Sequence, residues 1–305
     1  MRKFKGELCL LLASFIWGSA FIFQKMGMDH VGPFTFGFFR FTLGALALLP
    51  VIWITGRANA RRETPREITP FKDRVLLLGG LFCGIASFVA GSLQQVGLVY
   101  TTAGKAGFIT SMDIVIVPLL LIFLKQKVGI FTWAGVVLAS FGLYLVCMTE
   151  DLTIELGDGL VLGCAFFYSV QILLIDHFAE RVDAVKLSFL QFMVSGILSG
   201  IIAPVMVTIS LPSIVDCAVP ILYTAILEVS IAFTLQIIGQ KDTPPAIATI
   251  IMSLEAVFSA VCGALFLGEA MTGRETFGCA LMMTAFILAQ IPEMRKNSSQ
   301  QMIEK

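Results

Sequence analysis

The chain is built largely from apolar stretches of about twenty residues, each long enough to cross a bilayer core as an α-helix. Hydrophobic residues make up 57% of the sequence and charged residues only 14%, whereas an ordinary soluble domain carries about 25% charged residues. We therefore predict an all-α integral membrane protein with about ten transmembrane helices. The predicted spans are 7–26, 34–55, 75–99, 103–124, 129–148, 157–175, 185–208, 216–238, 245–267 and 273–292.

Composition and motifs argue against several functional classes. The net charge is zero, so nothing indicates a nucleic-acid partner. The seven cysteines are scattered and form no Cys-x-x-Cys pair, which argues against a disulfide framework or a zinc site. The segment "GLVYTTAGKA" (97–106) lacks the glycine spacing of a phosphate-binding loop, and neither His-Glu-x-x-His nor Gly-x-Ser-x-Gly occurs. We predict a protein that is not an enzyme and needs no cofactor or metal.

Basic residues indicate the orientation in the membrane. With ten spans, the clusters of Lys and Arg all fall on one side, which the positive-inside rule assigns to the cytoplasm. The opposite side includes the acidic "TEDLTIELGDG" (149–159). We predict a multi-pass protein of the bacterial plasma membrane with both termini in the cytoplasm. The basic clusters are Arg2, Lys3 and Lys5, the stretch 56–74, Lys125 and Lys127, Arg181 and Lys186, and Arg295 and Lys296.

The sequence repeats itself, which is the first sign of its internal architecture. A shift of 151 residues at the start, and of 142 in the middle, brings residues of the same or similar type together. We predict one five-helix repeat over 1–148, a second over 149–292, and a cytoplasmic tail at 293–305. The matched pairs include Gly6 and Gly157, Trp17 and Tyr168, Gln94 and Gln236, Gly97 and Gly239, Ser111 and Ser253, and Asp113 and Glu255.

Five spans are an odd number, so the second repeat has to enter the membrane from the opposite side. The prediction is an inverted repeat, in which a pseudo-two-fold axis in the membrane plane relates the halves around a central cavity. This architecture is characteristic of secondary transporters, which bind their substrates near the midplane and expose the site to each side in turn.

Four stretches resemble the EamA family of the drug/metabolite transporter superfamily. They are "FIWGSAF" (15–21), "FFRF" (38–41), "TTAGKAGFITSMDIVIVP" (101–118) and "SLEAVFSAVCGALFLGE" (253–269). Leu254-Glu255 and Gly268-Glu269 are similar to the family's Leu-Glu-Pro and Leu-Gly-Glu signature, although Ala256 stands in place of the proline. The resemblance covers essentially the whole chain. It implies a ten-helix carrier of small metabolites with a central cavity.

Four charged residues lie deep within predicted spans. Asp113 and Glu255 are each about ten residues into a span, or about 15 Å of helix rise, and Glu228 is about twelve residues in. Arg40 is the obvious counter-charge for one of the three carboxyls. In one interpretation, Asp113 or Glu255 pairs with Arg40 or caps backbone at a helix break, and only fastens helices. In the other, at least one carboxyl lines the cavity and binds a proton or a cationic substrate group.

Other polar residues in the spans leave similar alternatives. Lys105 lies near the outer end of its helix, where it either extends to the interface or acts as a cation of an outer gate. Trp17 and Tyr168 are at mid-depth, where they either line a substrate cavity or pack between helices. Burying an amide in lipid is costly, so we expect the intramembrane amides to face the protein interior. These amides are Gln94, Gln171, Gln191 and Gln236.

Taken together, these features predict a secondary-active transporter of small organic metabolites or drugs. Export is the favoured direction, and proton coupling is a hypothesis that rests on the midplane carboxyls. The bilayer and a small-molecule substrate are the expected partners, and both a monomer and a homodimer remain open. The alternatives are an intramembrane lipid-modifying enzyme and a membrane sensor or binding protein without transport.

Overall fold

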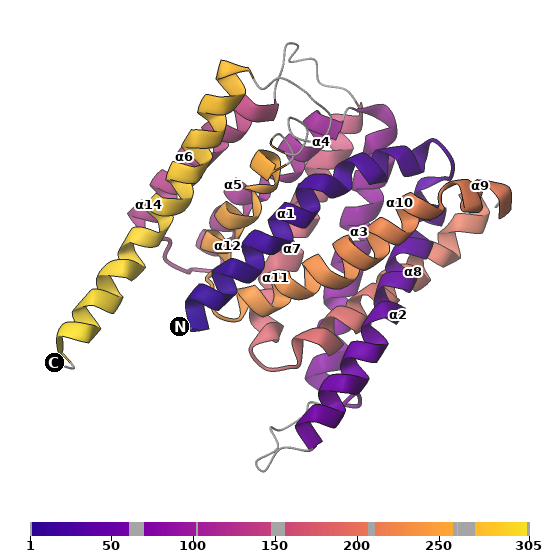
Figure 1. The fold of residues 1–305 in the computed structure, drawn as a ribbon, viewed down its shortest axis with the longest axis horizontal. Helices are drawn as coiled ribbons and strands as arrows, with labels where there is room; N and C mark the ends of the chain where they lie inside the picture. Colours follow the sequence, from indigo (N-terminus) through magenta and orange to yellow (C-terminus); the bar gives the residue numbers. More distant parts are fainter. Residues whose placement is uncertain are drawn as a thin grey trace.

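The computed structural model describes residues 2–60, 70–101, 103–147, 156–206, 211–258, 261 and 272–303, and every regular element in these ranges is a helix (Figure 1). The elements are α1 (Arg2–Met28), α2 (Pro33–Ala60), α3 (Arg74–Tyr100), α4 (Ala103–Thr110), α5 (Asp113–Phe123), α6 (Ile130–Cys147), α7 (Leu156–Ala179), α8 (Ala184–Met206), α9 (Leu211–Asp216), α10 (Ala218–Tyr223), the π-helix η1 (Thr224–Ala232), α11 (Phe233–Gln240), α12 (Pro245–Met252) and α14 (Gly273–Ile303).

The helices have the length and hydropathy of membrane spans. Within the described residues, seven helical stretches of 18 to 27 residues are apolar enough to cross a bilayer, and two shorter apolar helices cover Ile130–Val146 and Pro245–Phe258. These findings agree with the prediction of an all-α, multi-pass membrane protein. Predicted features that lie partly outside the described residues include the basic stretch 56–74, the acidic stretch 149–159 and the motif 253–269, of which Gly268-Glu269 is not described.

The outer surface of the bundle is apolar, as contact with lipid requires. Large hydrophobic side chains are exposed along most of the long helices, which a water-soluble monomer would not tolerate as a continuous surface. Near the end of α2, the guanidinium of Arg57 lies 3.8 Å from the centre of the Trp53 ring, an arrangement typical of the interface between lipid and water. Exposed examples include Leu12, Phe15, Leu46, Phe82, Phe141, Phe166 and Ile201.

Local sequence signals explain where several helices begin. Asp73 caps α3, because its Oδ1 accepts a hydrogen bond from the backbone N–H of Leu76 at 2.9 Å. A capping box starts α14: the N–H of Thr272 donates to Glu275 Oε2 at 2.7 Å, and the N–H of Glu275 donates to Thr272 Oγ1 at 3.2 Å. These short-range bonds satisfy backbone donors that the first turn of a helix leaves free.

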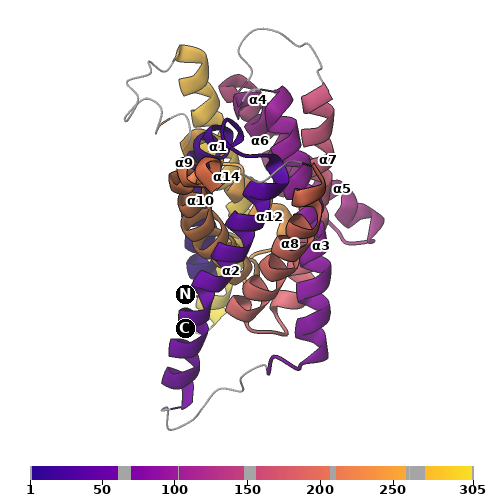
Figure 2. The same cartoon turned by 90° about the vertical axis from the view of Figure 1, so that its right-hand side faces the viewer.

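The largest helix–helix contacts join segments that are far apart in the sequence: α3 packs against α7, α2 against α8, and α6 against α14 (Figures 1 and 2). Helix α1 packs against η1 and α11. The free ends of the first and last helices lie at the same end of the bundle (Figures 1 and 2). Each of these contacts therefore joins one predicted repeat to the other.

Glycines allow two of these helix pairs to touch through their backbones. A Cβ atom added to Gly239 of α11 would lie 2.7 Å from the carbonyl oxygen of Gly6 in α1. A Cβ atom added to Gly157 of α7 would lie 2.8 Å from the carbonyl oxygen of Gly97 in α3. The absence of side chains at these positions sets the spacing of the helices, as small residues do in membrane proteins generally.

Substitution of Gly142 by alanine is expected to destabilise the protein by about 1–3 kcal/mol, because the new Cβ would lie 2.8 Å from the carbonyl oxygen of Gly278. The matched control is Gly56→Ala on α2, where no heavy atom lies within 4 Å of the new Cβ. Thermal unfolding in detergent measures both. Equal unfolding temperatures for the two variants would contradict the close packing of α6 on α14.

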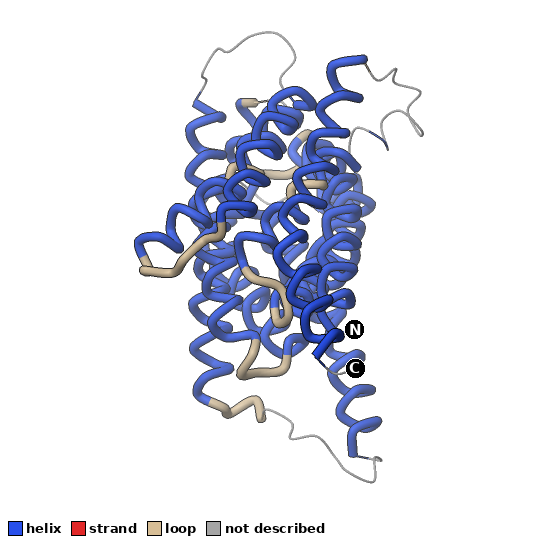
Figure 3. Tube along the Cα trace, turned by 90° about the vertical axis from the view of Figure 1, so that its left-hand side faces the viewer, coloured by secondary structure: helices blue, strands red, loops and turns tan. Residues whose placement is uncertain are grey.

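Three of the predicted spans are interrupted or distorted. The span expected at 103–124 breaks at Ser111 and Met112 between α4 and α5, and the span expected at 245–267 breaks at Ser253 and Leu254, after which residues 255–258 are helical again. The span expected at 216–238 contains the π-helix η1, in which hydrogen bonds join residues five apart rather than four apart as in an α-helix. Loops between the remaining described helices are short (Figure 3).

Candidate functional site

A cavity lies where the two broken helices meet α1, α3, α7 and the η1–α11 segment. It contains about 550 Å³ of space not occupied by atoms, its open mouth included. Its walls combine aromatic rings, amides and three carboxyls. The cavity therefore places polar and ionisable groups inside a molecule whose outer surface is apolar.

The helix breaks place two carboxyls in the cavity wall. Asp113 is the first residue of α5, and Glu255 is the first residue of the helical turn that follows the break after α12. Ser111, in the break between α4 and α5, donates a hydrogen bond from Oγ to Glu255 Oε1 at 2.9 Å. The start of a helix favours a negative charge, which helps to accommodate carboxylates in an otherwise apolar region.

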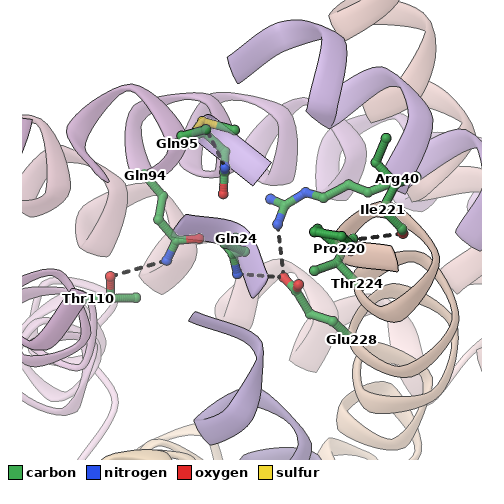
Figure 4. Close-up of polar contacts among 10 residues, drawn as sticks. Gln24, Arg40, Gln94, Gln95, Thr110, Pro220, Ile221, Thr224 and Glu228 are labelled. Atoms are coloured by element: carbon green, nitrogen blue, oxygen red, sulfur yellow. Dashed lines mark hydrogen bonds and ion pairs between the residues drawn. The ribbon is translucent and has the colours of Figure 1, made fainter. Parts of the chain in front are cut away.

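The third carboxyl belongs to a buried cluster beside the cavity (Figure 4). Glu228 lies in the middle of η1, and its Oε1 accepts hydrogen bonds from Arg40 Nη1 at 3.0 Å and Gln24 Nε2 at 3.1 Å. The Arg40 guanidinium is completely buried and lies 4.5 Å from the centre of the Phe41 ring. Arg40 thus pairs with Glu228 rather than with Asp113 or Glu255, and it neutralises only that carboxyl.

Aromatic side chains form an apolar wall of the cavity. Trp17 of α1 and Tyr168 of α7 both contact Phe233, with ring centres 4.9 Å and 6.3 Å from the centre of the Phe233 ring. The Trp17 indole Nε1 is buried and has no hydrogen-bond partner. Trp17 and Tyr168 therefore line the cavity and also pack between helices.

Hydrogen bonds from the amide side chains join the helices that form the cavity wall. Gln94 donates from Nε2 to Thr110 Oγ1 at 3.2 Å, which ties α3 to the end of α4 (Figure 4). Gln171 donates from Nε2 to Ser87 Oγ at 2.7 Å and to Gln191 Oε1 at 3.4 Å. As expected, Gln191 and the other amides are in the interior, although Gln191 itself does not line the cavity.

The cavity brings together most of the residues singled out in the sequence. Arg40 lies behind Glu228, outside the lining, and the side chain of Lys105 lies outside the described residues. Gln191 also lies outside the lining, and the other eight line the cavity: Trp17, Gln94, Asp113, Tyr168, Gln171, Glu228, Gln236 and Glu255.

Sequence reasoning missed several lining residues, of which Gln24 matters most because it shares Glu228 with Arg40. Its signal was present, since Gln24 is an amide inside the span predicted at 7–26. Phe21 and Phe233 carried no such signal, because phenylalanine is common throughout the spans. Within the described part of the chain, no group of three or more His, Cys, Asp or Glu side chains is placed to hold a metal ion.

Comparison with known proteins gives a consistent result. The model of the EamA-like transporter family matches residues 4–148 and again residues 155–290. An uncharacterized transporter of Archaeoglobus fulgidus is 32% identical over 95% of this chain and 87% of its own length. An uncharacterized transporter of Bacillus subtilis is 22% identical over 96% of each chain. A solved crystal structure with 17% identity shares the fold, with a TM-score of 0.75 over 95% of this chain and 98% of that one.

Proposed function

Because the chain belongs to the EamA-like transporter family, we propose that it is a secondary-active carrier that moves small organic metabolites or drugs across the membrane by alternating access. The observation that carries this proposal is the cavity at the two helix breaks. Breaks in membrane helices are tolerated where the backbone is buried in protein or lines a cavity, and such breaks form the substrate sites of many carriers.

The proposed architecture is ten helices in two inverted five-helix repeats, 1–148 and 149–292, followed by a tail at 293–305. Three pairings of repeat-related features support it. The helix breaks fall at Ser111 and at its repeat mate Ser253. The backbone contact of Gly6 with Gly239 has its mate in the contact of Gly157 with Gly97. The family model also matches the chain twice, in two consecutive segments.

The proposed location is the plasma membrane, with both termini in the cytoplasm. The grouping of Lys and Arg on one side of ten spans supports this orientation. The proposed direction is export, driven by protons that enter as the substrate leaves. Asp113 and Glu255 are the proposed proton-binding groups, because they line the cavity and no hydrogen bond or ion pair joins either of them to a basic side chain of the described residues.

Alternating access predicts that one position in the cavity can be reached from both sides of the membrane. In a background without native cysteines, Ala20→Cys, which lines the cavity, is expected to react with a membrane-impermeant thiol reagent added to either face. Ala13→Cys lies on the same helix, is fully buried and does not line the cavity, so it should react from neither face. Right-side-out and inside-out vesicles give the two measurements.

Labelling of Ala20→Cys from only one face of the membrane would contradict the proposed carrier function. A cavity with a single opening is what a lipid-modifying enzyme or a binding protein would have. If Ala13→Cys is labelled as strongly as Ala20→Cys, the reagent reaches packed positions as well. That result would contradict the interpretation that the reagent enters through the cavity.

A further inference from the structure

The buried polar atoms of the cavity wall that have no hydrogen-bond partner are mostly acceptors. Buried acceptors without a partner are Gln24 Oε1, Gln171 Oε1, Gln236 Oε1 and Glu228 Oε2, and all four side chains line the cavity. The carboxyls of Asp113 and Glu255 add further acceptors. Trp17 Nε1 is the only buried donor without a partner in the described lining.

For Gln24, the hydrogen-bond partner fixes which end of the amide donates. Gln24 has to direct its NH₂ group to the Glu228 carboxylate, which only accepts, so its oxygen is the atom left over. The Gln171 amide contacts Ser87 Oγ at 2.7 Å and the Gln191 amide at 3.4 Å. Buried polar groups without a partner cost stability unless a ligand or water satisfies them. Among the buried atoms of the described lining that have no partner, acceptors therefore outnumber donors by four to one.

The charge of the wall points in the same direction. Arg40 is the only Lys or Arg that any described lining residue bonds, and it bonds Glu228 from outside the cavity. Asp113 and Glu255 face the cavity without a cation of the described chain beside them, so the lining carries excess negative charge whenever either is ionised. A ligand carboxylate placed near these two groups would be repelled by their negative charge.

We propose that the cavity binds organic cations, with a protonated amine held by Asp113 and Glu255 and an apolar ring against Trp17, Tyr168 and Phe233. An ammonium group supplies three donors for the carboxyl oxygens, and the aromatic faces favour a nearby positive charge. The negative charge of the two carboxyls disfavours organic anions and the carboxylate of a zwitterionic amino acid. This inference rests on the proposed carrier function, because it names the substrate class of that site.

Three compounds that share one indole ring and differ in charge test the proposal. Tryptamine is a cation, tryptophan a zwitterion and indole-3-acetate an anion at pH 7. Isothermal titration of each into the purified protein in lipid nanodiscs is expected to show the tightest binding for tryptamine, with the other two weaker by about tenfold or more, the value of one charge-assisted hydrogen bond.

Variants locate the binding site. Asp113→Asn and Glu255→Gln are each expected to weaken tryptamine binding by about tenfold or more, because each removes a charge-assisted bond. Asp29→Asn removes an exposed carboxyl at the end of α1 and should change nothing.

Binding of tryptophan or indole-3-acetate as tight as that of tryptamine would overturn the proposal, and so would the absence of binding by all three. Unchanged tryptamine affinity in both carboxyl variants would also overturn it. None of these results bears on two-sided labelling of Ala20→Cys, so the carrier function and the cation site fail separately. Tryptamine binding together with one-sided labelling would keep the cation site and reject the carrier.

Discussion

Replacement of Arg40 by methionine is expected to destabilise the protein by about 3–5 kcal/mol, the largest stability effect of a single substitution that we predict. The reason is that Glu228 would keep its burial and lose its counter-charge, retaining only the hydrogen bond from Gln24. The stacking of the guanidinium on Phe41 would be lost as well. Thermal unfolding and denaturant unfolding in detergent measure the change.

The double variant Arg40→Met/Glu228→Gln is the matched control. It removes both charges, and the new amide can still accept the hydrogen bond from Gln24, so most of the lost stability should return. Glu228→Gln alone leaves Arg40 as the unpaired charge and should also be destabilising. If the free energy of unfolding of Arg40→Met is within about 0.5 kcal/mol of the wild-type value, the Arg40–Glu228 pair does not hold α2 against η1 as described.

Substitution of both cavity carboxyls, Asp113→Asn with Glu255→Gln, is expected to slow gradient-driven transport by about 10- to 100-fold. A proton-coupled exporter takes up protons from an acidic outer compartment and releases them inside, so acid outside drives the substrate out. Amides cannot carry protons through this cycle. Uptake of tryptamine into inside-out vesicles with an acidic lumen measures the rate, with Asp29→Asn as the control.

The stability of this double variant separates transport from structure. Neutral amides cost less to bury than ionised carboxylates, and the new amide oxygen at position 255 can still accept from Ser111, so the variant should unfold no more easily than the wild type. If instead it loses stability and keeps full pH-driven transport, the carboxyls only fasten helices. Full transport in both single variants would also reject proton coupling through these groups.

The sequence predicted the helices well because the apolar runs needed to cross a bilayer are long and continuous. It could not predict the interruptions inside them. The residues at the breaks, Ser111-Met112 and Ser253-Leu254, include no proline or glycine, and the π-helix around Glu228 has an ordinary apolar sequence. In each case the backbone leaves the α-helical pattern inside the bundle, where packing partners from distant segments decide its conformation.

Most residues of the candidate site could be predicted from the sequence, but the pairing of their side chains could not. Polar residues in apolar spans have to face the interior, so counting them found Asp113, Glu255, Glu228 and most of the amides. The partner of Arg40 was not predictable, because all three carboxyls have similar depth in their spans. Only the approach of α2 to η1 in three dimensions selects Glu228.

The backbone contacts at Gly6–Gly239 and Gly97–Gly157 have a mechanical consequence. Helices that pack through long side chains have to unlock interdigitated ridges and grooves before they can rotate against each other. At these two crossings neither glycine contributes a ridge of its own, and the neighbouring side chains of Leu10, beside Gly239, and Val161, beside Gly97, have to shift when the crossing angle changes. One contact involves the first turns of α1 and the other the first turn of α7, so each predicted repeat has one such close crossing against the other.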